Sequence, residues 1–283
     1  MATTTIAPGA APARRRTRGL TVTMRTLANS RTPLSVACFY GILILLILAP
    51  IYPVMAQANF QAIMGSGLMS AILGGHLPAS FTFSALLAVE VFSSIYGLLF
   101  GGFVAFMGGA ALPVTIEDGT LDLALSRPIS RTRYYLENWF GVLIGALVIS
   151  LALILGVWID TLLVANAGID WQWMLLTLLI QWTFLFFSAG LGMLAGSCIN
   201  ASRAAGGTAV GIIVLAYLIN TFGGLSDQLQ WMLKISPFYY APAIDPLINH
   251  HLTWWYPWTL VSAGLVCGLV GLLIFQRRDL PTI

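Results

Sequence analysis

Six long apolar runs, separated by short polar stretches, limit what this chain can fold into. A helix of about 20 apolar residues crosses the roughly 30 Å hydrocarbon core of a bilayer. Charged residues make up only 8% of the 283 residues, against about 25% in soluble proteins. The sequence therefore predicts an all-α polytopic membrane protein and excludes an ordinary soluble domain.

The boundaries of the spans follow from the apolar runs and from the prolines that interrupt them. The six spans are expected at about 34–49, 83–112, 140–164, 173–198, 205–222 and 258–275. The first span continues to Ala56 if its helix tolerates Pro50 and Pro53. Membrane helices tolerate proline where neighbouring groups satisfy the freed backbone.

The N-terminal region divides into a tail and a short helix ahead of the six-span domain at 33–283. Residues 1–19 are mostly Ala, Pro, Thr and Arg without an apolar stretch, so they predict a disordered basic tail and no secretory signal peptide. Leu20, Met24 and Leu27 recur at helical spacing. This pattern favours an amphipathic helix at 20–32 lying in the membrane interface, with a frayed basic tail as the alternative.

Two further segments are expected on the outer side. Residues 57–82 carry no charge and are interrupted by glycine and proline, which indicates a segment resting on the membrane. The segment 223–257, between the fifth and sixth spans, places Leu225, Leu229 and Met232 at helical spacing before a break at Pro237.

The distribution of Lys and Arg predicts the orientation of the chain. Cytoplasmic segments of membrane proteins carry an excess of these residues. With both termini inside, the expected cytoplasmic segments hold Arg14, Arg15, Arg16, Arg18, Arg25, Arg31, Arg127, Arg131, Arg133, Arg203, Arg277 and Arg278. Only Lys234 is left outside, so six spans with cytoplasmic termini in a cell membrane are expected.

Five pairs of glycines four residues apart fall in the last five spans, one pair in each. Small residues let membrane helices approach closely, so the pairs predict a tightly packed bundle. The pairs are Gly97 with Gly101, Gly141 with Gly145, Gly192 with Gly196, Gly207 with Gly211, and Gly264 with Gly268.

A polar island lies between the second and third apolar runs. Thr115 and Asp118 suit the N-terminus of a short helix starting near Ile116, because a hydroxyl and a carboxylate satisfy free amides there. Pro128 disfavours helix at the residue before it, and Ser130 can cap a new helix that enters the third span. A short helix, a break and a second helix start are therefore expected.

The same island resembles the signature of a transporter family. It contains Glu117-Asp118-Gly119-Thr120-Leu121-Asp122-Leu123, followed by Ser126-Arg127-Pro128-Ile129-Ser130-Arg131. This is similar to the acidic-pair, Gly-Thr-Leu and Arg-Pro-(Ile/Val)-Ser-Arg pattern of type 2 ABC exporter permeases. In that family the stretch is a cytoplasmic loop that docks into a separate ATPase subunit as a coupling helix.

The resemblance implies a site, partners and a class of substrate. The coupling and ATPase-docking residues would be Glu117, Asp118, Gly119, Thr120, Leu121, Asp122, Arg127, Pro128 and Arg131. Two ABC ATPase subunits, carrying the ATP and Mg, and a second permease copy, identical or a close paralogue, would complete the exporter. Similar permeases often export antibiotics or other drugs, so a lipophilic or amphipathic substrate is expected.

The chain itself lacks the chemistry of an ATPase. Its only lysine, Lys234, stands between Leu233 and Ile235, whereas a phosphate-binding loop needs Gly-Lys-Ser/Thr. We therefore expect this chain to have no enzyme activity, no cofactor and no metal site. Its expected partners are the lipid bilayer and the other exporter subunits, and no nucleic acid is expected among them.

Glu90 is the one ionisable residue that the sequence places well inside a span. A carboxylate at membrane depth costs a few kcal/mol unless it faces a cavity or a partner, which makes Glu90 a candidate for the translocation path. The alternative is a structural carboxylate with satisfied hydrogen bonds, since Glu90 is about two turns from the outer end of its span.

Two other functions remain open from sequence. A self-sufficient secondary transporter or channel predicts paired intramembrane charges and often an internal repeat. A non-transporting membrane scaffold would use the same polar island only to anchor a partner.

Overall fold

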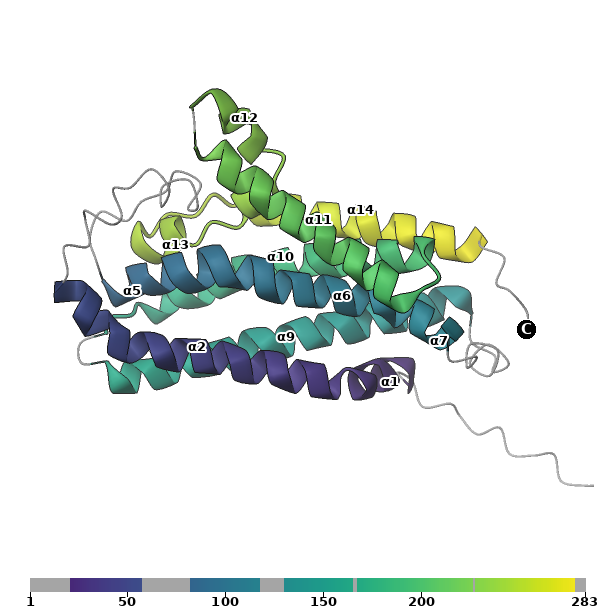
Figure 1. Cartoon of the computed structure of the whole chain (residues 1–283), viewed down its shortest axis with the longest axis horizontal. Coiled ribbons are helices and arrows are strands. Elements are labelled where there is room, and N and C mark those ends of the chain that lie inside the picture. The colour runs from purple at the N-terminus through teal and green to yellow at the C-terminus, as the bar shows by residue number, and fades with distance from the viewer. Residues whose placement is uncertain (1–20, 58–81, 118–129, 165–166, 226, 278–283) are drawn as a thin grey trace, which may run out of the picture.

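The computed structural model describes residues 21–57, 82–117, 130–164, 167–225 and 227–277, and every regular element among them is helical. Six of these helices or helical rods are long and apolar enough to cross a membrane. They run side by side in a bundle (Figure 1). The predicted fold class and the count of six spans are confirmed for the described residues.

The spans are built from the following elements. The first is α2 (Arg31–Gln57), and the second joins α5 (Phe83–Leu86), η1 (Leu87–Gly101) and α6 (Gly102–Ala111) before the short α7 (Pro113–Glu117). The others are α9 (Arg131–Leu163), α10 (Trp171–Cys198), α11 (Ser202–Gly223) and α14 (Trp255–Arg277). Between α11 and α14 lie η2 (Asp227–Leu229), α12 (Gln230–Leu233), η3 (Pro237–Tyr240) and α13 (Ile244–Ile248).

The ends of several spans differ from those expected because polar caps, and not apolar residues, decide where a helix begins. The third span starts at Arg131, well before Phe140, because the Ser130 hydroxyl accepts a hydrogen bond from the Arg133 amide. Asp170 caps α10 in the same way. The first span continues through Pro50 and Pro53, as the longer alternative predicted.

The short N-terminal helix α1 (Thr21–Asn29) lies against the start of α9. Its buried face is formed by Thr23 and Thr26, whereas Met24 is 70% exposed. The side of α1 that packs on the protein thus carries two threonines beside the partly buried Val22, and Met24 lies on the exposed side. The expected tail at 1–19 and most of the outer segment at 57–82 lie outside the described residues.

The second rod and α10 form the centre of the bundle. α6 packs against both α10 and α11, α2 packs against α9, and α14 packs against α10. The outward faces of α2, α9, α11 and α14 carry exposed leucines, isoleucines and valines. Such faces suit a lipid environment, because hydrocarbon tails are as apolar as these side chains.

Glycines bring the central helices into backbone contact. A Cβ atom added at Gly196 would lie 2.6 Å from the Gly109 carbonyl oxygen, and one at Gly109 would lie 2.8 Å from the Gly206 Cα. The pairs at 97/101, 141/145 and 264/268 also meet neighbouring side chains or backbone. The pair at 207/211 has nothing within 4 Å, so four of the five pairs serve packing within the chain.

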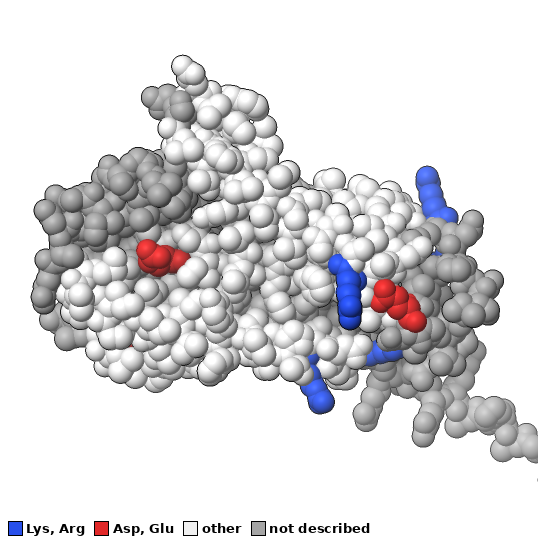
Figure 2. All heavy atoms as spheres, in the orientation of Figure 1, with Lys and Arg blue, Asp and Glu red and all other residues white. Residues whose placement is uncertain are grey.

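Positive charge gathers at one end of the bundle. Arg131 at the start of α9 contacts the end of α14, and α7 contacts the start of α11, so these termini share one end. Lys and Arg side chains on the face drawn in Figure 2 lie over the half of the molecule that holds α1 and α7. Lys and Arg are thus concentrated at one end of the bundle, as their distribution along the sequence predicted.

The close contact between α6 and α10 gives a direct test of the packing. Gly192→Ala would place a methyl group against the backbone at Ala105, Gly108 and Gly109, which cannot move aside as a side chain would. We expect it to destabilise the purified protein by about 1–3 kcal/mol, measured as a lower temperature of aggregation in detergent.

Gly211→Ala is the matched control, because it adds the same methyl group where no atom lies within 4 Å. It should leave stability unchanged or raise it slightly, since alanine favours helix over glycine. Equal losses in both variants would show that α6 and α10 are not packed through Gly192.

Candidate functional site

All but one of the residues singled out from sequence lie in or beside one connection, the segment 118–129 between the second and third spans. Asp118, Gly119, Thr120, Leu121, Asp122, Arg127 and Pro128 fall inside this segment and outside the described residues. The structure places Glu117 and Arg131 at its two borders, and Glu90 far away near the other end of the second rod.

The helix that enters the segment begins earlier than expected. α7 starts at Pro113, whose fixed backbone angle and missing amide hydrogen suit a first helical position. Thr115 lies inside α7, where its hydroxyl donates to the Leu112 carbonyl at 2.8 Å and accepts from the Tyr134 hydroxyl at 2.8 Å. The expected role of Thr115 as the cap of a helix from Ile116 is wrong, because Pro113 starts the helix.

Glu117 is the last residue of α7 and not part of a first turn. Its carboxylate accepts hydrogen bonds from the Ser202 amide, at 2.9 Å, and from the Ser202 hydroxyl. These two bonds, with a smaller contribution from Arg203, lower the pKa of Glu117. The side chain is thus held in its ionised form against the start of α11, a partner 85 positions along the chain.

The other border of the segment contacts the last span. The Arg131 guanidinium donates to the Gln276 carbonyl at 3.3 Å, in the last turn of α14. The Gln276 side chain donates in return to the Thr132 hydroxyl at 2.9 Å. Two adjacent residues of α9 are therefore tied to the end of α14.

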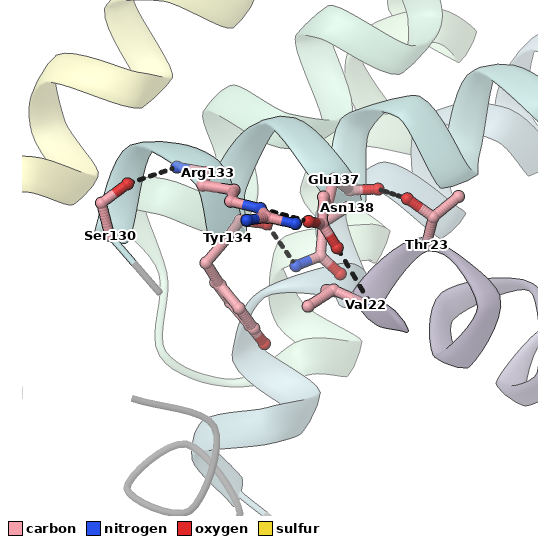
Figure 3. Close-up of polar contacts among 7 residues, drawn as sticks. All are labelled: Val22, Thr23, Ser130, Arg133, Tyr134, Glu137 and Asn138. Carbon is pink, nitrogen blue, oxygen red and sulfur yellow. Dashed lines mark hydrogen bonds and ion pairs between the residues drawn. The ribbon is translucent and has the colours of Figure 1, made fainter. Parts of the chain in front are cut away.

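A buried carboxylate ties α9 to α1 (Figure 3). Glu137 is 6% exposed, and its carboxylate accepts from Arg133 Nε at 2.7 Å and from the Val22 amide at 3.0 Å. The Thr23 hydroxyl donates to the backbone carbonyl of Glu137 at 2.9 Å. The Val22 amide is in the first turn of α1, which has no intrahelical acceptor, so Glu137 acts as its cap.

A second chain of hydrogen bonds continues from α1 to α7. The Thr26 hydroxyl donates to Asn138 Oδ1 at 2.8 Å, and Asn138 Nδ2 donates to the Tyr134 carbonyl at 2.9 Å. Tyr134 in turn reaches Thr115 of α7 through its hydroxyl. α1, α7 and α9 thus form one hydrogen-bonded group beside the segment.

Glu90 lies on η1, a π-helix of 15 residues. The wide turn is visible in the side-chain bonds of Ser93 and Ser94, which each reach the carbonyl five residues earlier. Glu90 is partly buried, and no described residue makes a hydrogen bond or ion pair with it. π-helical turns occur frequently at functional sites.

Glu90 is not the only carboxylate inside a span. Asp160 lies near the end of α9 opposite to Arg131, is fully buried, and has no hydrogen-bond partner for either oxygen among the described residues. Asp160 can be recognised from the sequence as a carboxylate inside a span, because it lies within the apolar run at 140–164. The sequence-based prediction named only Glu90. A buried polar group without a partner is costly and marks a place to look for function.

The fold and these borders define a class of protein. The chain is a multi-pass membrane protein whose connection between the second and third spans is bound at both borders to other spans at the same end of the bundle. Residues 115–276, more than half of the chain, match the family model described as the multidrug efflux system permease Rv1217c, C-terminal domain.

The chain belongs to this permease family, and the match begins at the polar island and covers the last four spans. It agrees with the resemblance to exporter permeases drawn from the sequence. No individual curated protein matches the chain.

The anchoring of α1 can be tested at Glu137. Glu137→Ala removes the acceptor of the Val22 amide and the partner of Arg133. We expect α1 to detach more readily, at a cost of about 1–3 kcal/mol, seen as faster hydrogen exchange at residues 21–29 with the spans unaffected.

Thr132→Ala serves as the control. It removes a hydrogen bond from the same end of α9, but this bond connects α9 to α14 and not to α1. Exchange at residues 21–29 should stay at the level of the unmodified protein. Unchanged exchange in Glu137→Ala would mean that α1 is held by other contacts.

Proposed function

We propose that this chain is the membrane-spanning permease subunit of an ATP-driven ABC exporter. Two separate ATPase subunits would bind and hydrolyse ATP, and two permease copies would form the path. The family supports the general assignment to multidrug efflux. The ATPase partner follows from the signature at 117–131 and from the absence of a phosphate-binding loop in the sequence.

The observation that carries this proposal is the attachment of the segment 118–129 to the rest of the bundle. Its first border is bonded to α11 through Glu117, and its second to α14 through Arg131. Arg133 and Glu137 extend the second border to α1. A force applied to the segment by a partner would therefore reach three other helices without passing through the membrane core.

The second part of the proposal concerns the path and the substrate. In the resembled family the inner ends of the first, second and fifth spans frame the path, and we assign α2, α6 and α11 to it here. Glu90 on η1 would contact the substrate or the water that enters with it, because an unpaired carboxylate needs a polar surrounding. A lipophilic or amphipathic drug-like molecule fits the family and the apolar bundle.

The orientation and the second copy complete the proposal. The arginine-rich end, with the segment 118–129 and both termini, would face the cytoplasm of a cell membrane. The exposed apolar faces of α2 and α11 leave room for a second permease copy, either identical or a close paralogue, with lipid over the remainder.

A secondary transporter remains the second candidate because of Asp160. Together with Glu90 it makes two carboxylates inside the spans without described partners, and such groups serve proton or cation coupling in transporters. An ATP-driven exporter predicts transport that depends on a copurifying ATPase, whereas a secondary transporter predicts transport driven by an ion gradient alone.

Purification of the chain with its partners tests the proposed function. We expect an ABC ATPase to copurify from the native membrane, and drug-like substrates to stimulate its ATP hydrolysis after reconstitution. Glu117→Ala combined with Asp118→Ala should abolish transport while the permease stays folded in the membrane. Full transport by the purified chain in ATP-free vesicles with a proton gradient would favour the second candidate.

Glu90→Gln tests the assignment of the path. The substitution keeps the size of the side chain and removes its charge, so transport and substrate-stimulated hydrolysis should change by about tenfold for cationic substrates, while assembly with the ATPase remains. Asp170→Asn is the control: it also removes one negative charge from the outer half, and asparagine still caps α10. If the unmodified protein, Glu90→Gln and Asp170→Asn transport several substrates equally well, Glu90 has only a structural role.

A further inference from the structure

Asp160 is a buried acid without a donor. It lies in the last turn of α9, is fully buried, and receives no hydrogen bond at either carboxylate oxygen from the part of the chain that the structure describes. The last turn is the negative end of the helix dipole, which makes a negative charge there more costly. An ionised carboxylate in such a place needs a positive charge beside it.

The basic residues of the chain do not supply that charge. The sequence has no Lys or Arg between Arg31 and Arg127, and none between Arg133 and Arg203. The helices α2 and α9 therefore carry arginine only at their starts, and α10 carries none. Arg133 lies about 40 Å from Asp160 along α9.

The helices α2 and α10 are the neighbours of α9 at the level of Asp160. α9 packs against α1, α2, α6, α10 and α14. Of these, α1, α6 and α14 meet its first half, at Glu137, Gly145 and Trp139. The start of α10 follows the end of α9 along the chain after a few residues.

The titratable groups of these neighbours offer no positive charge. Tyr52, in the second half of α2, is partly buried and packs on Phe83 with ring centroids 5.3 Å apart. The first half of α10 has no titratable side chain, and Asp170 just before it caps the helix. Further acids and histidines described toward this end are Glu90, Asp245, His250 and His251, and both histidines are exposed.

The packing of α2 on α9 shows what faces Asp160. The two helices meet at three glycines, where an added Cβ atom would lie within 4 Å of a side chain of the partner helix. The pairs are Leu34 with Gly145, Gly41 with Leu153, and Leu45 with Gly156. In each pair the α9 residue follows its α2 partner by the same number of positions, to within one. The next pair in this register is Ala49 with Asp160, one turn further on, and Ala49 is also buried.

Ala49 presents a backbone carbonyl that lacks its usual donor. That donor is the amide four residues later, and the residue there is Pro53, which has no amide hydrogen. A carbonyl inside a membrane needs another donor. Asp160 and the Ala49 carbonyl are therefore two acceptors at one level. A proton on Asp160 would turn one of them into a donor, whereas a metal ion needs a larger set of oxygen ligands.

We propose that Asp160 is a proton-binding site: the folded chain holds Asp160 in its neutral form, which donates a hydrogen bond to the Ala49 carbonyl and joins α2 to α9. Release of the proton would leave two acceptors facing each other and loosen this end of α2. The inference does not depend on the exporter assignment, because the buried acid has to be neutralised whatever drives transport.

Infrared spectroscopy of the full chain in lipid vesicles tests the protonation state directly, because a protonated carboxylic acid has a C=O stretching band separate from that of a carboxylate. The difference spectrum between the unmodified protein and Asp160→Asn at neutral pH should contain this band. Asparagine keeps the size of the side chain and can donate to Ala49, so the variant should fold. Asp170→Asn is the matched control: it removes an exposed acid that accepts from two amides, and its difference spectrum should lack the band.

Unfolding in denaturant at several pH values gives a second measurement. An aspartate in the unfolded chain ionises above about pH 4, whereas the folded chain keeps the proton on Asp160, so rising pH favours the unfolded state. Compared with that of Asp160→Asn, the unfolding equilibrium constant of the unmodified protein should rise about tenfold per pH unit above about pH 5, until the folded site releases its proton.

Pro53→Ala tests the role of the Ala49 carbonyl, because it restores the missing amide. Asp160→Leu fills the site without a donor, whereas Asp160→Asn keeps one. The ratio of the unfolding constants of these two variants should fall by about three- to tenfold when Pro53→Ala is also present, since Ala49 then has a donor of its own. An unchanged ratio would contradict the assignment of Ala49 as the partner.

Two results would overturn the proposal as a whole. The first is absence of the acid band from the Asp160→Asn difference spectrum, which would show that Asp160 is ionised. The second is stabilisation of the unmodified protein, and not of Asp160→Asn, by sodium chloride relative to choline chloride. That result would show that a metal ion and not a proton neutralises the acid.

Discussion

The structure depends on the backbone contact between α6 and α10, which only glycine allows. Gly108 and Gly109 on one helix meet Gly192 and Gly196 on the other, with no side chain between them. Membrane helices gain little from burying apolar surface against each other, because lipid is equally apolar, so close packing must supply the stability. This contact places the second and fourth spans at the centre, and the other spans are arranged around them.

Charged and polar residues at one end of the bundle add a different kind of connection. Glu117, Arg131 and Glu137 each bond a helix end that belongs to another element. Such bonds have direction and can break and re-form one at a time, whereas the glycine contact between α6 and α10 cannot be changed without separating the two helices. The end with the polar bonds is therefore the part of the bundle best suited to respond to a partner.

The sequence predicted the spans well because each is a long apolar run, and length and hydropathy are local properties. It could not predict that Glu117 caps α11, since that pairing joins residues 85 positions apart and no local pattern records it. The prediction that Thr115 caps a helix was wrong for a local reason, because Pro113 starts the same helix two residues earlier. Asp160 could have been found from its place in an apolar run, but its burial without a partner required the packing of neighbouring helices.

The hydrogen bonds of α1 also bear on how the chain is made. Val22 binds Glu137, which the ribosome adds 115 residues later. At a synthesis rate of about 5–20 residues per second, α1 must wait on the order of ten seconds for its partner. During that time the Val22 amide and the Thr23 hydroxyl lack their acceptors on α9. Docking of α1 can therefore only follow synthesis of the third span, which makes the first helix of the chain one of the later elements to reach its final place.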